Sequence, residues 1–81
     1  MATHKLKIWP EYLNLILKGE KQFEVRKNDR NFKVGDSLIL QEWNPATGEY
    51  TGSHIHRTVT YILKQGNPFI ELGEFVIMSI K

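Results

Sequence analysis

Three residues whose side chains could bind a nucleotide lie close together in the first half of the chain: Lys21, Glu24 and Arg26. If residues 22–27 form a strand, Glu24 and Arg26 point to the same side, about 7 Å apart, because strand side chains repeat every two residues. A carboxylate accepts from an exocyclic amine such as that of cytosine, and an arginine binds a phosphate or a base edge with two donors. With the positive charge of lysine, these residues could hold one base and its phosphate.

The same residues also fit a simple surface ion pair, in which Glu24 pairs with Arg26 or with Lys21. Such a pair would stabilise the fold by less than about 1 kcal/mol. The spacing alone favours this interpretation. A binding site therefore needs support from elsewhere in the sequence.

Further candidates lie on either side of this group. Asn28-Asp29-Arg30-Asn31 is typical of a turn, because Asn and Asp bond to their own backbone. On such a turn, Lys27 and Arg30 would extend the positive rim of a cleft. Trp43 faces away from the apolar residues of its predicted strand and precedes a loop, so it is a candidate platform for stacking a base. Trp9, in contrast, is expected in the core.

Metal and cofactor chemistry have little support. His54 and His56 would share one face of a strand, but no cysteine and no obvious third ligand accompany them, which favours an exposed polar face. The sequence contains no phosphate-binding loop, dinucleotide glycine pattern or Ser/His/Asp arrangement. We therefore predict no metal and no cofactor.

The length and composition limit the kind of fold that can position these residues. The 81 residues are enough for one domain, residues 1–81, and the absence of cysteine excludes disulfides. The net charge of +2 is unevenly spread: residues 1–40 carry eight Lys/Arg and five Asp/Glu, or +3, whereas residues 41–81 carry three and four, or −1. The excess of positive charge in the first half fits a solvated face or a phosphate-binding patch.

With no apolar run of roughly 18 residues and no secretory signal, we expect a cytoplasmic protein that does not contact membranes.

One helix is predicted near the N-terminus, after a short strand over residues 5–8. Pro10 suits the first helical turn, and Gly19 suits the left-handed residue that ends a helix. Apolar residues between them recur at helical spacing and predict one buried face: Trp9, Tyr12, Leu13, Ile16 and Leu17.

The rest of the chain predicts strands and turns. Alternating patterns indicate strands over residues 22–27, 37–43, about 54–63 and 75–80, with a loop over residues 64–73. On the long strand, Ile55, Val59, Tyr61 and Leu63 are expected on one side. The result is a mostly β (α+β) domain of about five strands with one helix after the first strand. Closing into a small barrel would remove exposed edges, and an open sheet with the helix on one face is the alternative.

The segment Gly19-Glu20-Lys21-Gln22-Phe23-Glu24-Val25-Arg26 matches the pattern Gly-x-Lys-x-x-Glu-x-Arg. It resembles the signature of the ASCH (activating signal cointegrator homology) domain, a branch of the PUA-like superfamily. With the segments 6–12, 23–30, 32–36 and 59–63, the chain is similar to small ASCH-like proteins of bacteria and phages. This resemblance implies a PUA-like β-barrel. It also implies that RNA or a nucleotide-like ligand binds between the helix and the strand that follows, at Lys21, Glu24 and Arg26.

An enzyme is the alternative that the resemblance raises. One bacterial ASCH protein type, the acetylcytidine amidohydrolase, uses a lysine, a threonine and a later glutamate, and its lysine corresponds to Lys21. The threonine position is Glu24 here, and the short connection over residues 64–73 offers no clear counterpart for the glutamate. The sequence therefore favours a binding module over an enzyme. A module that binds a protein partner is the third possibility.

Overall fold

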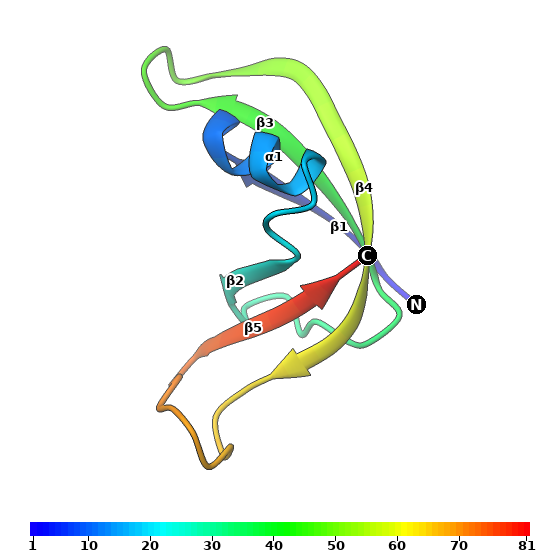
Figure 1. Cartoon of the computed structure of the whole chain (residues 1–81), viewed down its shortest axis with the longest axis vertical. Coiled ribbons are helices and arrows are strands. Elements are labelled where there is room, and N and C mark those ends of the chain that lie inside the picture. The colour runs from blue at the N-terminus through cyan, green and yellow to red at the C-terminus, as the bar shows by residue number, and fades with distance from the viewer.

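The computed structural model describes residues 1–81 and contains five strands and one helix (Figure 1). The prediction of a mostly β domain with one helix after the first strand is confirmed. No helix has the length and apolar character that a membrane crossing requires. In chain order the elements are β1 (Thr3–Ile8), α1 (Pro10–Leu17), β2 (Phe23–Lys27), β3 (Ser37–Asn44), β4 (Glu49–Leu63) and β5 (Phe75–Ile80).

The short helix α1 begins and ends where its sequence indicates. Pro10 occupies the first turn, where its missing N–H leaves no hydrogen bond unmade. At the other end Gly19 has a φ of +77°, its N–H donates to the carbonyl of Ile16, and the N–H of Glu20 donates to that of Leu15. This pair of bonds is the Schellman arrangement, which requires a left-handed residue at the position of Gly19. The chain therefore turns sharply out of α1 toward β2.

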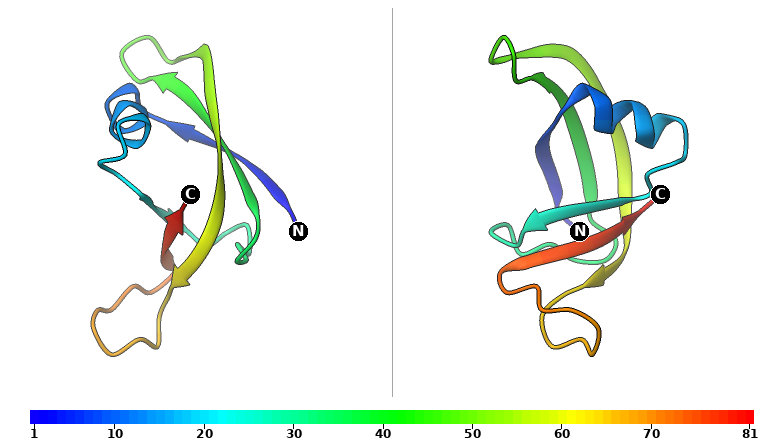
Figure 2. Two further views of the ribbon diagram at one scale, coloured as in Figure 1. Left: turned by 45° about the vertical axis from the view of Figure 1, so that its right-hand side comes forward. Right: turned by 60° about the vertical axis from the view of Figure 1, so that its left-hand side comes forward.

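The strands form one sheet in the order β1-β3-β4-β5-β2, in which only the β1–β3 pair is parallel. The long strand β4 runs through both halves of the sheet, pairing with β3 along its first part and with β5 along its last part (Figure 1). It begins at Glu49, earlier than the predicted start near His54. The two rotated views show how strongly the sheet curls, with α1 on the side toward which β2 and β5 bend (Figure 2).

The curled sheet does not close, and the predicted barrel is therefore wrong. β1 and β2 are the two edge strands of the sheet. Two arginine side chains reach β1: Arg26 of β2 donates through Nη2 to the backbone carbonyl of Lys7. Arg30, on the turn after β2, donates through Nη1 to that of Lys5 at 3.0 Å. These guanidinium groups take the place that backbone N–H groups of a paired strand would occupy at the free edge of β1. The open sheet with a helix on one face is the architecture found.

The core lies inside the curl, where Leu13 and Ile16 of α1 meet the inner face of the sheet. The buried apolar residues are Leu6, Ile8, Leu13, Ile16, Phe32, Leu38, Leu40, Val59, Val76, Met78 and Ile80. Tyr61 was expected on the same side as Val59, but it is exposed. The register of β4 against β5 shifts by one residue between Val59 and Tyr61, and such a bulge reverses which side chains face inward. Ile62 packs against the core instead.

A buried polar pair ties β1 to the turn before β3. The Nε2 atom of His4 lies 2.8 Å from Oδ2 of Asp36, and both residues are buried. Asp36 also accepts from the backbone N–H groups of Ala2 and Lys33, each at 3.0 Å. The hydrogen bond from Ala2, followed by that from His4, lowers the pKa of the Asp36 carboxyl to about 2 against the opposing effect of burial. Sequence reasoning did not single out this pair.

Candidate functional site

Strand β2 places its polar side chains inward. Glu24 is 4% exposed, whereas Phe23 and Val25, on the opposite face, are 45% and 48% exposed. A strand that covers a core ordinarily turns its apolar face inward, so β2 departs from the usual pattern. The inward position of Glu24 and Arg26 requires partners for their charges.

Lys21 lies on the connection between α1 and β2. The Schellman turn at Gly19 directs this connection back under the helix, and the Nζ of Lys21 donates to the carbonyl of Phe23 at 2.7 Å. The same Nζ lies 2.6 Å from Oε1 of Glu24. The turn that ends the helix therefore places Lys21 beside the buried carboxylate of Glu24.

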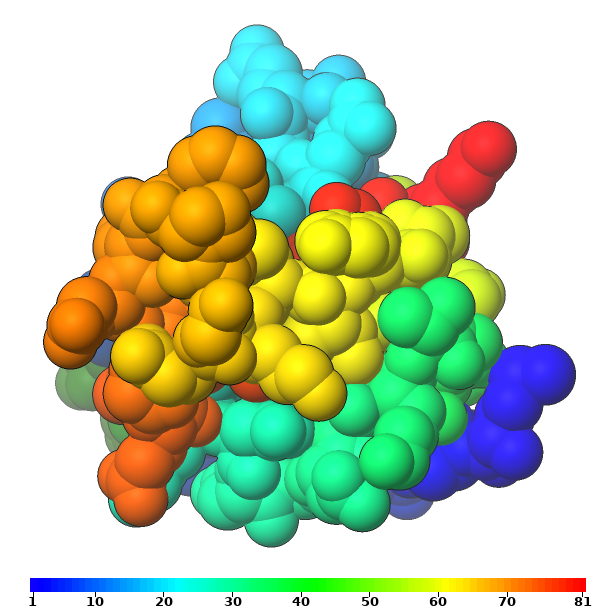
Figure 3. Space-filling model, turned by 90° about the horizontal axis from the view of Figure 1, so that it is seen from below, coloured from blue at the N-terminus to red at the C-terminus, as the bar shows by residue number.

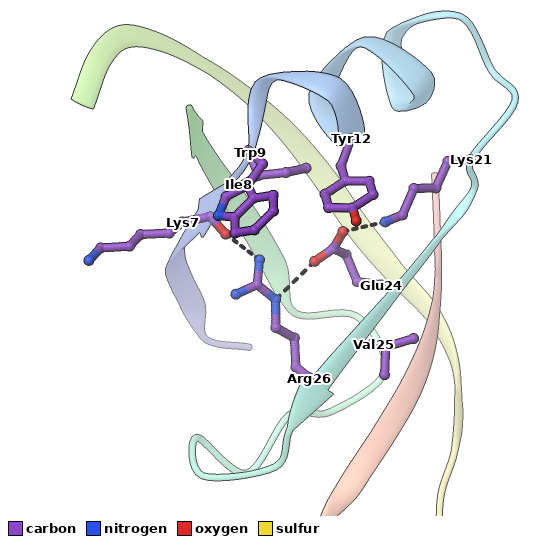
Figure 4. Close-up of a pocket in the computed structure, with 8 residues that line it drawn as sticks. All are labelled: Lys7, Ile8, Trp9, Tyr12, Lys21, Glu24, Val25 and Arg26. Carbon is purple, nitrogen blue, oxygen red and sulfur yellow. Dashed lines mark hydrogen bonds and ion pairs between the residues drawn. The ribbon is translucent and has the colours of Figure 1, made fainter. Parts of the chain in front are cut away.

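Glu24 is shared by two cations. Its Oε1 accepts from Lys21, and its Oε2 accepts from Nε of Arg26 at 2.9 Å (Figure 4). The three side chains are 5%, 16% and 26% exposed, in the order Glu24, Lys21 and Arg26. The three predicted residues are thus brought together, and the ion pair considered as the simple alternative is present as well. Unlike an exposed surface pair, this one has a carboxylate withdrawn from water.

These residues form one wall of a pocket of about 440 Å³. The opposite wall comes from the end of β1 and the start of α1, and Figure 4 shows both walls facing the same space. The volume falls within the range of small-molecule sites. Its lining residues are Lys7, Ile8, Trp9, Tyr12, Lys21, Glu24, Val25 and Arg26.

Two aromatic rings belong to this pocket. Trp9 was expected in the core, but it is 45% exposed, and Tyr12 is 42% exposed. Trp9 precedes the helix as its N-cap, so its indole lies at the helix entrance rather than on the buried face. The two rings are stacked, with centroids 6.0 Å apart and planes 20° from parallel. A planar ligand therefore has aromatic surface available in the pocket.

The pocket has a net positive charge and N–H donors that form no hydrogen bond within the protein. Three cations (Lys7, Lys21 and Arg26) and one carboxylate (Glu24) line it, which gives a net charge of +2. Arg26 has five N–H donors, and its bonds to Glu24 and to the carbonyl of Lys7 use two, leaving three. Lys21 has three N–H donors, of which two form hydrogen bonds, to the carbonyl of Phe23 and to Glu24. Unused donors beside a net positive charge suit an anionic ligand.

Two of the predicted rim residues lie elsewhere. Lys27 is on the outward side of β2, since it differs in parity from Glu24 and Arg26, and its Nζ lies 3.6 Å from Oε2 of Glu74. Arg30 is directed to the carbonyl of Lys5. Neither is among the residues that line the pocket.

Trp43 also lies outside the pocket, on the hairpin that joins β3 and β4. It pairs across the hairpin with Tyr50. The Nζ of Lys7, a pocket residue, lies 4.6 Å from the centroid of the Trp43 ring and 5.9 Å from that of Tyr50. This cation–π contact places Trp43 beside the site, separated from it by Lys7.

His54 and His56 lie on β4 as an exposed pair, with ring centroids 5.6 Å apart. No group of three or more His, Cys, Asp or Glu residues could hold a metal ion. The structure thus agrees with an exposed polar face at these two histidines.

Sequence reasoning missed five of the eight lining residues, of which Lys7, Trp9 and Tyr12 offer a charge or an exposed aromatic ring. Helical periodicity assigned Trp9 and Tyr12 to the buried face, of which only Leu13 and Ile16 are buried. The available signal was Pro10, since a residue that precedes a proline at the first helical position lies outside the helix.

The fold and the site together define a small, β-rich domain with a cationic, aromatic-lined pocket between its helix and an edge strand. Residues 3–80 match the family described as "Domain of unknown function (DUF3850)", and the chain belongs to this family. Over 57 residues it is 42% identical to the uncharacterized 12.9 kDa protein in the GpA 3′ region of Escherichia phage P2. The aligned segment covers 70% of this chain and 50% of that protein, so the chain spans about half the length of the curated relative it matches. The expected kinship to a phage protein is confirmed.

Proposed function

We propose that this protein binds RNA or a nucleotide-like ligand in the pocket between α1 and β2. The observation that carries the proposal is the convergence of Lys21, Glu24 and Arg26 on one pocket that also contains the exposed ring of Trp9. Each element of a nucleotide then has a matching group: cations for the phosphate, a carboxylate for a base amine and an aromatic ring for the base face.

The unused N–H groups of Arg26 and Lys21 are the donors for the phosphate or for a base edge. Arginine holds a phosphate with two parallel hydrogen bonds, whereas lysine contributes a point charge. Glu24 already accepts one hydrogen bond on each oxygen, and each oxygen can accept another. Its remaining capacity is available for an exocyclic amine such as that of cytosine.

We also propose that the domain is of the ASCH type within the PUA-like superfamily. The signature residues, from Gly19 to Arg26, include the turn that ends α1 and the three charged residues of the pocket. The sheet is strongly curled but open, so the signature segment supports this assignment and a closed barrel does not.

The amidohydrolase alternative has less support. It requires Lys21 to act on an acyl group, but the Nζ of Lys21 is held by Glu24 and by the carbonyl of Phe23. An ammonium group beside a carboxylate is a poor nucleophile, because its lone pair is occupied by a proton. Release of the acyl group from acetylated cytidine, abolished by Lys21→Ala, would reverse this preference.

The experiment that tests the binding proposal is calorimetric titration at low ionic strength with cytidine and uridine monophosphates. We expect cytidine monophosphate to bind more tightly, because uracil lacks the amine that Glu24 would accept. Arg26→Ala should weaken both nucleotides. Lys27→Ala is the matched control, because Lys27 follows Arg26 on β2 but faces away from the pocket. The absence of heat with both nucleotides and with oligoribonucleotides would overturn the proposal.

A further inference from the structure

A second hollow lies at the connection between α1 and β2. It has a volume of about 410 Å³ and shares Lys21 with the pocket. We call it the basic hollow. Its lining residues are Ile16, Leu17, Lys18, Gly19, Lys21, Gln22, Arg57, Ile80 and Lys81.

The charged side chains of the basic hollow are all cationic: Lys18, Lys21, Arg57 and Lys81. Lys18, Arg57 and Lys81 form no ion pair, since the four ion pairs of the structure involve other residues. The one side-chain hydrogen bond among these three is that of Arg57 Nη1 to the backbone carbonyl of His56, at 2.8 Å. None of these three side chains therefore has an ion-pair partner.

The two adjoining cavities concentrate the cations of the chain. Together they are lined by six of its 11 Lys/Arg residues and by one of its nine Asp/Glu residues, for a net charge of +5 against +2 for the whole chain. The six cations are Lys7, Lys18, Lys21, Arg26, Arg57 and Lys81. Charge gathered in this way attracts a ligand whose own negative charges are repeated.

The space-filling view from below (Figure 3) shows two segments that contribute residues to the basic hollow. The residues around the end of α1 and the following connection, in cyan, project from the body on the same side as the C-terminal end of the chain, in red (Figure 3). Both segments line the hollow.

We propose that the ligand is a single-stranded oligoribonucleotide rather than a free nucleotide. This inference rests on the proposed function: one nucleotide occupies the pocket, and the phosphates of its neighbours follow Lys21 into the basic hollow. Lys21 is the residue common to both cavities, so it lies where successive phosphates of one strand would pass. A nucleoside monophosphate would occupy the pocket and would not reach the basic hollow.

The test is a length series of cytidine mono-, di- and trinucleotides, titrated calorimetrically against the full chain at several salt concentrations. We expect the trinucleotide to bind at least about tenfold more tightly than the mononucleotide, with a steeper dependence on salt. Arg57→Gln should weaken the trinucleotide about five- to tenfold, make its log–log salt slope shallower by about 0.7 and leave the mononucleotide within about twofold. Lys18→Gln should act in the same way, and Lys27→Gln is the control outside both cavities.

Each failure has its own signature. Binding of the mononucleotide with no gain from added length, or equal weakening of mono- and trinucleotide by Arg57→Gln, would overturn this inference and leave the proposed function standing. Binding of inorganic tripolyphosphate as tightly as the trinucleotide would also overturn it, because charge alone would then explain the affinity. No binding of any nucleotide would overturn both proposals.

Discussion

The Nε of Arg26 lies 2.9 Å from Oε2 of Glu24, and the same guanidinium donates to the backbone carbonyl of Lys7 on β1. One arginine thus connects a buried carboxylate on one edge strand with the free backbone edge of the other. The contact that joins the two edges of the sheet is also part of the pocket wall. Stability and ligand binding are therefore linked at Arg26.

Replacing the buried carboxylate tests that linkage. Glu24→Gln removes the negative charge shared by Lys21 and Arg26 and leaves both cations facing an amide. We expect the free energy of unfolding, measured by urea denaturation, to fall by about 1–3 kcal/mol, the usual range for hydrogen bonds to charged groups. An unchanged free energy of unfolding would show that the ion pairs contribute nothing.

The same variant separates charge from base recognition. Because Glu24→Gln raises the net charge of the pocket from +2 to +3, we expect uridine monophosphate to bind at least as tightly as to the unmodified protein. The preference for cytidine over uridine monophosphate should narrow, because the amide can still accept from the cytosine amine but can also donate to O4 of uracil. Retention of the full preference in calorimetric titrations would contradict the role proposed for Glu24.

Trp9 is expected to stack on the base. Trp9→Ala should cost about 1–3 kcal/mol of nucleotide affinity, the range for base–aromatic stacking, while the folded state persists because the ring is 45% exposed. Trp43→Ala, outside the pocket, is the matched control for mononucleotide binding. If both variants bind a mononucleotide as the parent does, Trp9 is not a stacking platform.

Gly19 positions Lys21 through the turn at the end of α1. A Cβ at Gly19 would meet nothing within 4 Å, so Gly19→Ala acts only through the φ of +77° and should destabilise the fold by about 1–2 kcal/mol. Gly48 has a similar φ of +71° and equally open surroundings, but it lies in the β3–β4 hairpin. We expect similar denaturation midpoints for Gly19→Ala and Gly48→Ala, with weaker nucleotide binding only for Gly19→Ala. Equal nucleotide affinities of Gly19→Ala and Gly48→Ala would show that the turn at Gly19 does not position the site.

Asp36 gives the fold a defined sensitivity to acid. Its pKa is lowered from 3.8 to about 2 in the folded state, so the unfolded chain binds more protons between these values, and the stabilisation is lost as the pH falls through them. Above about pH 4 this contribution is complete. In urea denaturation, the difference in unfolding free energy between the protein and Asp36→Asn should be constant above about pH 4 and shrink toward pH 2. A difference independent of pH would contradict the assigned role of Asp36.

Much of the fold was predictable because local rules and tertiary structure agree. Pro10 and Gly19 mark the ends of α1 through backbone restrictions that do not depend on the rest of the molecule. The strand β5 coincides with the prediction, since every second residue of it is buried. Tyr61 was misplaced because a bulge depends on the partner strand.

The three charged residues of the site were predictable from the sequence, but their environment in the fold was not. Lys21, Glu24 and Arg26 were identified together, yet their spacing could not show that β2 turns its polar face inward. The spacing also could not show the partners of Lys27 and Arg30, because Glu74 and the carbonyl of Lys5 come from distant parts of the sequence. Closure of the sheet depends on the same long-range contacts, since Arg26 and Arg30 occupy the edge of β1 that a barrel would pair.

The most direct test of the central claim is to map ligand contacts by amide and indole NMR shifts during titration with cytidine monophosphate. We predict shifts at Lys21, Glu24 and Arg26 and at the indole N–H of Trp9, with none at the exposed His54 and His56. Shifts confined to residues outside the pocket, or no shifts at saturating nucleotide, would contradict the claim that this pocket binds a nucleotide.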